Sequence, residues 1–323
     1  MKFITMHPAI QRFFWEDCTW VNNLLSLGVS KEDIIIVATD LKDAPNVAKD
    51  YPQIIKDMYG VQVFEFKDKR PPMALAYQPS IKPYLWTQLL TYYPEMEQYD
   101  YIITDSDVIF REIPNFNKTP VDKYTWYGSD TESYTGVDYM AEKGQDFLAR
   151  IAPILGISEN DFWFYKGKAV GAQWVISHPQ LAYWQDVYVK SYTLFDKTKQ
   201  MEPEYIERYR QEGRPDFYFY QVWVAEMTAT LYLCKKYGIT PVITPELDFD
   251  WSSDMEIAVQ DKGRKIIHNS GVTAQEAQEK NLFYKAKYTN ISPLGTDLSW
   301  VNKKYVSHEY AEAIMAVGAV GKV

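Results

Sequence analysis

Two aspartates one residue apart carry the strongest chemical signal in the sequence. Asp105-Ser106-Asp107 directly follows the apolar segment DYIIT and precedes the apolar residues VIF. If a strand ends there in a bent turn, both carboxylates can reach a single divalent cation. Hard oxygen ligands with open positions suit Mg²⁺ or Mn²⁺ that carries a diphosphate. A pair of exposed turn aspartates is the other interpretation of so short a motif, and the spacing alone leaves both open.

A histidine late in the chain supplies a second candidate ligand. His268 follows the apolar pair Ile266-Ile267 and begins the segment His268-Asn-Ser-Gly271. Such a histidine can be a packed, hydrogen-bonded residue, or its imidazole can join carboxylates at a Mn²⁺-type site. The sequence has only four histidines. The hypothesis is therefore a metal site formed by Asp105, Asp107 and His268.

The first third of the chain predicts the elements that would position these residues. Apolar strands and amphipathic helices alternate, which is typical of parallel pairing with right-handed crossovers. Ligands bind at the carboxyl ends of such strands. We expect Thr5, His7, Thr39 and Asp40 to gather there with the acidic turn. The expected strands are residues 2–6, 33–38, 61–66 and 100–104, and the expected helices are residues 8–27, 47–59 and 81–91.

The rest of the chain predicts a less regular, helix-rich half. Strands are expected at residues 124–127, 169–177, 242–244 and 265–267, and helices at residues 145–155, 179–198, 203–212 and 217–237 and from residue 308 onward. The helix at 217–237 is apolar nearly all round, so we expect it to be buried. The fold class is therefore α/β, with a mixed central sheet and a single domain over residues 1–323, divided into halves at residues 1–110 and 111–323.

Composition excludes several classes of protein. The chain has 323 residues, 46% hydrophobic and 24% charged, the balance of an ordinary globular protein. Its net charge of −9 disfavours general nucleic-acid binding. Cys18 and Cys234 form no CxxC, so neither a disulfide scaffold nor a zinc ribbon is expected. No apolar segment is long enough for a membrane span or reads as a targeting signal, and we expect a cytoplasmic protein of a bacterium or of a virus-infected host.

The order of these motifs resembles the GT-A-type glycosyltransferases that use nucleotide-sugar donors, and in general pattern the retaining, glycogenin-like ones. The resemblance covers most of the chain: an α/β half, the DxD motif, a Gly171-Ala172-Gln173 strand and the His-x-x-Gly segment. It implies a Rossmann-type nucleotide-binding half and transfer of a hexosyl or pentosyl group, with retention, from a donor such as a UDP-sugar. Glycogenin-like enzymes follow the His-x-x-Gly closely with Lys-Pro-Trp, whereas this chain has Val272-Thr273-Ala274.

The resemblance also implies roles for individual residues. Asp107 and His268 would hold Mn²⁺ or Mg²⁺, and Asp105 would contact both the metal and the ribose, with Ser106 beside it. The residues expected at the base and ribose are Thr5, His7, Thr39 and Asp40. Lys82 would reach a phosphate or the transferred sugar. Lys285 or Lys287 could replace the missing phosphate-binding lysine.

A group on the other face of the sugar must support the oxocarbenium-like state or accept the acceptor's proton. Four residues are candidates: Glu226, Gln173, Asp130 and Asp216. Glu226 stands in an apolar helix, so it needs a partner or a shifted pKa, and a structural ion pair is the other interpretation. Asp216 could instead cap the start of that helix.

Two other functions remain open from the sequence. A haloacid-dehalogenase-type phosphatase also places D-x-D after an apolar strand, with Asp105 as nucleophile and Asp107 as acid/base. Against it, Ile109 stands where that pattern has Thr, and no later GDxxxD-like acidic pair follows. A non-catalytic sugar- or nucleotide-binding module is the second alternative.

The acceptor of a transferase could be a glycan, a protein, a lipid or a hydroxylated base in DNA. Candidates for a surface on which a sugar or base could stack are Trp126, Tyr127, Trp163, Tyr165 and Trp251.

Overall fold

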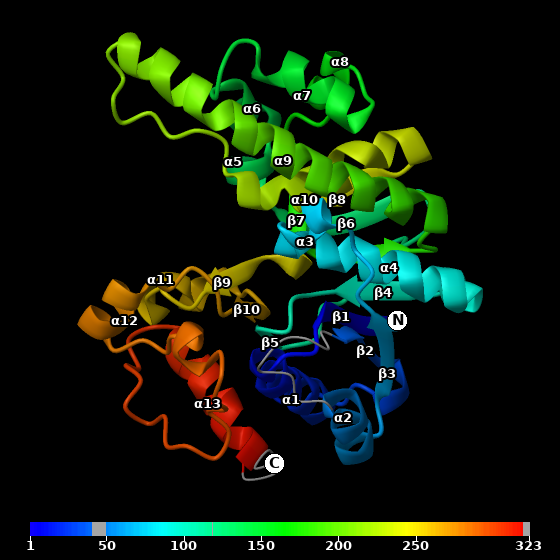
Figure 1. Ribbon diagram of the computed structural model, residues 1–323. Coiled ribbons are helices and arrows are strands. Elements are labelled where there is room, and N and C mark those ends of the chain that lie inside the picture. Colours follow the sequence, from blue (N-terminus) through cyan, green and yellow to red (C-terminus); the bar gives the residue numbers. More distant parts are fainter. Residues whose placement is uncertain (41–49, 118, 319–323) are drawn as a thin grey trace. The chain divides into compact units, whose positions relative to one another are not determined.

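The computed structural model describes residues 1–40, 50–117 and 119–318 (Figure 1). Two compact units make up the chain, and each is described by itself. The first unit is discontinuous: it consists of Met1–Asp68, Ile102–Lys118 and Pro245–Val323. The second consists of Lys69–Tyr101 and Thr119–Thr244. The division of a single domain at residue 110 remains a prediction.

Parallel strands form the start of the first unit. β1 (Lys2–Pro8), β2 (Ile34–Asp40) and β3 (Gln62–Lys67) lie in the order β3-β2-β1, and both pairs are parallel. Helix α1 (Gln11–Ser26) connects β1 to β2, and α2 (Tyr51–Tyr59) precedes β3. Gly60, in the left-handed conformation with φ 68°, ends α2. The predicted alternation of strand and helix is confirmed. The near-continuous apolar runs of β1 and β2 suit strands that are buried on both faces.

A small sheet joins distant parts of the first unit. β5 (Val108–Phe110) pairs antiparallel with β10 (Ile266–His268), and β10 pairs parallel with β9 (Phe249–Trp251). The register places His268 opposite Val108. Helices α11 (Glu256–Val259), α12 (Ala274–Lys280) and α13 (Ser307–Val317) complete the unit, and α13 packs against α1. The small sheet therefore brings the histidine segment next to the end of the acidic turn.

The second unit contains a mixed sheet covered by helices. β6 (Thr125–Asp130) pairs antiparallel with β7 (Val170–Ser177) and parallel with β8 (Thr240–Ile243), while β4 (Asp100–Ile103) lies where the chain leaves this unit. Its helices are α3 (Pro72–Leu75), α4 (Ile81–Tyr92), α5 (Glu132–Thr135), α6 (Val137–Ala141), α7 (Phe147–Leu155), α8 (Glu159–Phe164), α9 (Leu181–Gln211) and α10 (Ala225–Leu233). The predicted α/β class, with mixed strand pairing and many helices late in the chain, is confirmed.

Aromatic side chains fill the core of the second unit. Trp86 stacks on Trp184 with ring centroids 5.2 Å apart, and Trp126 meets the ring of Tyr183 edge-on at 5.1 Å. All four side chains are buried. Aromatic pairs of this kind add to the free energy gained by burying their large apolar area. The high aromatic content of the chain is thus explained mainly by packing.

Two helix predictions in this unit were wrong. The segment predicted as one helix over residues 217–237 contains only α10, flanked by 3₁₀ turns at Val222–Val224 and Cys234–Tyr237. Its first residues, FYFYQVWV, are aromatic or β-branched except for Gln221, and such residues have low helix propensity. Conversely, α9 continues through Pro203, whereas two separate helices were expected at residues 179–198 and 203–212. Pro203 is exposed, so water can bind the carbonyl that loses its helical partner.

Among the described residues, no helix has the length and apolar character needed to cross a membrane.

Candidate active site

The acidic turn links β4 to β5 and is held at both ends by backbone hydrogen bonds. The amide of Thr104 donates to the carbonyl of Ile4 in β1, at 3.2 Å. The amide of Asn269, just after β10, donates to the carbonyl of Asp107, at 2.9 Å. Asp107 is buried, whereas the side chain of Asp105 is 30% exposed. The turn is therefore fixed in place and keeps one carboxylate open to solvent.

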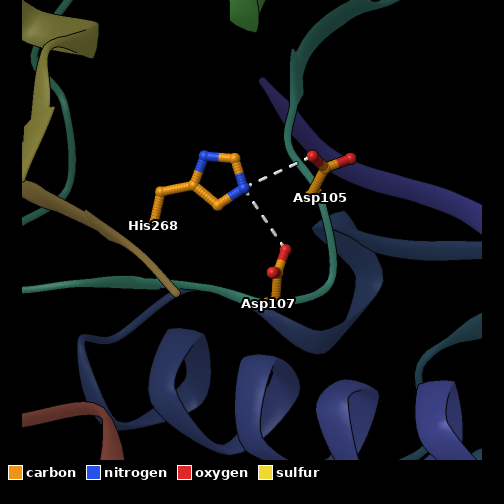
Figure 2. Close-up of side chains that lie close together, drawn as sticks. All are labelled: Asp105, Asp107 and His268. Carbon is orange, nitrogen blue, oxygen red and sulfur yellow. Dashed lines mark ion pairs between the residues drawn. The ribbon is translucent and has the colours of Figure 1, made fainter. Parts of the chain in front are cut away.

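His268 points at both carboxylates of the turn (Figure 2). Its Nε2 lies 3.4 Å from Oδ1 of Asp107 and 3.5 Å from Oδ2 of Asp105. Burial lowers the pKa of His268, but Asp107 and Asp105 raise it more, to about 9. Burial also opposes ionisation of Asp107, yet Lys285 and His268 hold the pKa of that carboxyl well below its usual range. The predicted convergence of Asp105, Asp107 and His268 is thus present in the structure.

Two aromatic rings fix the orientation of the imidazole. Trp251 stacks on His268 with ring centroids 5.5 Å apart and an interplanar angle of 20°, and Phe249 meets it edge-on at 5.3 Å. Both rings come from β9, the strand paired with the histidine's own strand. A metal ligand is most effective when its neighbours hold it in one orientation. Trp251, suggested by the sequence as a stacking surface, therefore lies against the candidate ligand.

The three side chains fit a divalent metal ion. One ligand atom from each of Asp105, Asp107 and His268 lies within 4.8 Å of the other two, and no other such group of acids, histidines and cysteines occurs in the described part of the chain. Metal–ligand bonds of about 2.0–2.2 Å allow two ligand atoms on one ion to be at most about 4 Å apart. The two distances from Nε2 of His268, 3.4 and 3.5 Å, meet this limit. Two carboxylates and one imidazole are a donor set that suits Mn²⁺ or Mg²⁺.

A lysine from late in the chain also reaches this group. Nζ of Lys285, which starts the 3₁₀ turn Lys285–Tyr288, forms an ion pair with Oδ2 of Asp107. The sequence suggested Lys285 or Lys287 as the phosphate-binding cation, and Lys287 is exposed. The structure thus places Lys285 beside the candidate metal ligands, and its contact with a phosphate remains a prediction.

Side chains of helix α1 hold the acidic turn by hydrogen bonds, a feature that the sequence did not predict. Oγ of Ser106 donates to Oε2 of Glu16 at 2.8 Å, and Oε1 of the same carboxylate accepts from Nε of Arg12 at 2.7 Å. Further along the helix, Trp20 donates to the hydroxyl of Thr104 at 3.1 Å. The available signal was Glu16 itself, because a carboxylate among FFW and CTW in an apolar helix needs a partner.

The residues predicted to line the base and ribose pocket lie on β1 and β2. Thr5 and Thr39 are buried, and no described residue forms a hydrogen bond with either hydroxyl. Asp40 ends β2, and its side chain lies outside the described residues. His7 is buried and already engaged: Nε2 is 2.9 Å from Oδ1 of Asp17, and Nδ1 is 3.2 Å from the carbonyl of Pro8. Contact of these four residues with a nucleotide remains a prediction.

The ion pair of His7 makes the stability of the fold depend on pH. Burial lowers the pKa of His7, but the carboxylate of Asp17 raises it more, so it lies above the ordinary value. The stabilisation by protonated His7 is expected to be complete below about pH 6.5 and to be lost as the pH rises through the higher pKa of the folded state. His7→Gln removes this titration. The advantage of the wild type over His7→Gln in free energy of unfolding should therefore shrink as the pH rises.

Urea unfolding of the wild type and His7→Gln, from below about pH 6.5 to above the pKa of folded His7, measures this difference in free energy of unfolding. His178→Gln is the matched control, because His178 is exposed in the second unit. A difference between the wild type and His7→Gln that stays constant with pH would contradict the prediction.

The four candidates for the sugar's other face all lie in the second unit. Gln173 is buried in β7, where its Oε1 accepts from Ser129 at 3.1 Å. Asp130 is exposed at the end of β6 and accepts from the amide of Glu132 at 2.9 Å. Glu226 is buried in α10 and accepts from the hydroxyl of Thr230 at 3.0 Å. These contacts describe each residue within its unit, and a catalytic role for any of them remains a prediction.

Asp216 and Lys82 complete the predicted set in this unit. Asp216 lies in an exposed turn well before α10, so it does not cap the start of that helix as the sequence suggested. Lys82 is the second residue of α4. Of the other aromatic candidates, Trp126, Tyr127 and Tyr165 are buried, and Trp163 is 43% exposed. Only Trp163 among these has the exposure that stacking on a sugar requires.

An irregularity in the sheet lies next to Asp130 and Gln173. The register between β6 and β7 shifts between Gly128 and Ser129, and Ala172 has a left-handed backbone with φ 55°. The hydroxyl of Ser129 bonds the carbonyl of Gly171 within this bulge. Bulges re-aim side chains and are common next to active sites.

Comparison with known proteins gives low similarities. No family model and no curated protein matches the chain. Three solved structures that resemble this chain in fold are glycosyltransferases. The galactosyltransferase LgtC, in complex with donor and acceptor sugar analogues, has 11% identity and a TM-score of 0.49, over 100% of this chain and 98% of LgtC. The bifunctional glycosyltransferase WbbM has 8% identity and a TM-score of 0.46, over 97% of this chain.

The third is a glycosyltransferase involved in glycosylation of the major capsid of PBCV-1, with 10% identity and a TM-score of 0.37, over 86% of this chain and 96% of that one. The present chain spans about half of WbbM, 49% of its length. Identities and scores at this level transfer no activity, substrate or partner to the chain.

Proposed function

We propose that this chain is a GT-A-type, metal-dependent glycosyltransferase that moves a hexosyl or pentosyl group from a nucleoside-diphosphate donor to a hydroxyl acceptor. The observation that carries the proposal is the convergence of Asp105, Asp107 and His268 within 4.8 Å, from two distant parts of the sequence. A UDP-sugar is the first donor to test. Retention of configuration, in the manner of glycogenin-like enzymes, is part of the proposal.

The residues of the first unit would hold the metal and the diphosphate. Asp105, Asp107 and His268 would bind Mn²⁺ or Mg²⁺, which supplies positive charge where the leaving diphosphate becomes negative. Trp251 keeps the imidazole of His268 in the orientation that the site needs. Lys285 adds a cation at the same place. The chain thus provides a fixed group of ligands and charges before any substrate arrives, which is the arrangement that stabilises developing charge best.

The remaining roles complete the proposal. Thr5, His7, Thr39 and Asp40 would contact the base and ribose, and Lys82 would contact a phosphate or the sugar. One of Glu226, Gln173, Asp130 and Asp216 would act at the sugar's acceptor face. A cytoplasmic location is proposed. The acceptor is a hydroxyl of a glycan, a protein, a lipid or a modified base in DNA.

The phosphatase alternative is not favoured. In that mechanism Asp105 attacks phosphorus and Asp107 transfers the proton. Here Nε2 of His268 lies 3.4 Å from Asp107 and 3.5 Å from Asp105, and Lys285 pairs with Asp107. A pKa held well below its usual range makes Asp107 a poor proton donor, whereas an ionised carboxylate suits a metal ligand.

Thermal unfolding with nucleotides tests the proposal. The wild type and His268→Ala are heated with UDP, GDP, CDP, ADP or TDP, each with and without Mn²⁺. A ligand at a hundred times its dissociation constant stabilises the native state by about 2.7 kcal/mol. We expect one nucleotide to raise the melting temperature of the wild type only when Mn²⁺ is present, and His268→Ala to lose that shift. No shift with any nucleotide would remove the transferase proposal, and phosphatase turnover would be assayed next.

A further inference from the structure

Arg12 is a cation close to the acidic turn, and the outer edge of its guanidinium has no hydrogen-bond partner among the described residues. Its Nε donates to Glu16, and its guanidinium carbon lies 5.2 Å from the ring centroid of Phe13. No described residue accepts a hydrogen bond from either terminal nitrogen, and the side chain is 27% exposed. Burial lowers the pKa of Arg12, but Glu16 and Asp107 raise it more, so the group stays charged. Four N–H bonds of a permanent cation are therefore available to a ligand.

Glu16 ties this guanidinium to the candidate metal ligands. One oxygen of its fully buried carboxylate binds Arg12, and the other accepts from Ser106, the residue between Asp105 and Asp107. Both hydrogen bonds are short, at 2.7 and 2.8 Å. A charged hydrogen bond in a buried place holds its partners in one geometry. The position of Arg12 is thus linked to the acidic turn through a single side chain.

Two cations are therefore tied to the acidic turn. Lys285 pairs directly with Asp107, and Arg12 is linked to Ser106 through Glu16. Together with a divalent ion, Lys285 and Arg12 would outweigh the three carboxylates of Asp105, Asp107 and Glu16 by one positive charge, which favours an anionic ligand. A guanidinium with a free edge matches the geometry of two phosphate oxygens.

We propose that Arg12 binds the diphosphate of the donor, and that Glu16 is a positioning residue that aligns Arg12 with the acidic turn. This inference rests on the function proposed above. It adds a phosphate-binding residue from α1 to a site otherwise formed by the acidic turn, His268 and Lys285. Arg12 stabilises the bound diphosphate, while Glu16 makes no contact with it.

Binding of inorganic pyrophosphate to the full chain tests this inference without knowledge of the base or sugar. Mn²⁺ affinity is measured first, from the loss of the electron paramagnetic resonance signal of free Mn²⁺. Pyrophosphate is then titrated by calorimetry with and without the metal. Arg12→Gln is expected to weaken pyrophosphate binding about tenfold or more, because it removes charged hydrogen bonds. It should leave Mn²⁺ affinity within about twofold of the wild type, since no metal ligand changes.

Three further variants complete the experiment. Lys303→Gln removes an exposed cation from the same unit and should bind both ligands like the wild type. Arg12→Lys keeps the charge without the fork of the guanidinium, so an intermediate loss is expected, and it replaces Arg12→Gln if that variant does not fold. Glu16→Gln alone should weaken pyrophosphate binding. The double variant Glu16→Gln/Arg12→Gln should bind pyrophosphate no more weakly than Arg12→Gln alone.

The outcomes separate the two proposals. Unchanged pyrophosphate affinity in Arg12→Gln, with Mn²⁺ binding intact, would overturn the role of Arg12 and leave the metal site standing. Independent losses from Glu16→Gln and Arg12→Gln would overturn the positioning role of Glu16. A wild type that binds no Mn²⁺ would contradict the proposed function. In that case an effect of Arg12→Gln on metal-free pyrophosphate binding would still support the anion site, and no effect would reject it.

Discussion

Replacing Asp107 with asparagine is expected to slow nucleotide release from a nucleotide-sugar donor by about a thousandfold, or roughly 4 kcal/mol in the activation free energy. Asparagine keeps the shape of the side chain but removes the charge that Lys285 and His268 face. The site would lose its most buried anionic ligand and with it the cation that offsets the developing negative charge. The measurement is release of the nucleoside diphosphate from a panel of donors in Mn²⁺.

Two controls make this result specific to the site. Asp297→Asn changes an exposed aspartate of the same unit and should retain the wild-type rate. Because Asp107 is ionised and paired in the folded state, the variant is also expected to melt at a lower temperature, so rates are compared well below its unfolding. Wild-type turnover by folded Asp107→Asn would show that this carboxylate holds no essential cation.

Replacing Asp250 with alanine is expected to cause a large loss of stability. Asp250 is fully buried in β9, where it accepts from Arg111 at 2.5 Å and from Arg264 at 3.1 Å. Removing it leaves two half-buried guanidinium groups without that partner. Breaking a buried ion pair on one side costs about 3–5 kcal/mol, and we expect the lower value because both arginines retain some contact with water. For a chain of 323 residues, a loss of about 3 kcal/mol should lower the melting temperature by roughly 4–5 °C.

Chemical unfolding of the wild type and Asp250→Ala measures the change in free energy directly. Glu312→Ala is the matched control, because Glu312 forms an exposed pair with Lys303 at 3.9 Å. Exposed pairs contribute about 0–1 kcal/mol. Equal stabilities of the two variants would show that the buried pairs of Asp250 do not hold the small sheet in place. Because β9 pairs with β10, the same variant should also weaken Mn²⁺ binding at His268.

Local patterns were sufficient to predict the first strands and the candidate metal ligands. β1, β2 and β3 are short apolar runs separated by amphipathic helices, and parallel order follows from that alternation. Asp105 and Asp107 stand at a strand end, and His268 follows an apolar pair. In each case the chemistry and the element that positions it are adjacent in sequence, so a single sequence shows both.

The contacts that depend on tertiary structure could not be predicted. Glu16 reaches Ser106, and His7 reaches Asp17, through side-chain directions that periodicity does not define. The helix expected over residues 217–237 is mostly replaced by loop and 3₁₀ turns, because the aromatic and β-branched residues before α10 have low helix propensity. Pro203 shows the opposite effect, since the packing of α9 maintains a helix across a residue that usually ends one.

The division of the first unit into three chain segments has a consequence for synthesis. β1, β2 and β3 are made first, but the small sheet and α13 come from Pro245–Val323, after the whole second unit has been translated. Every segment of the second unit is therefore available to fold before β9, β10 and α13 have been made. Asp107 and His268 can meet only once Pro245–Val323 has been made, so the candidate metal site is assembled after the second unit has been translated.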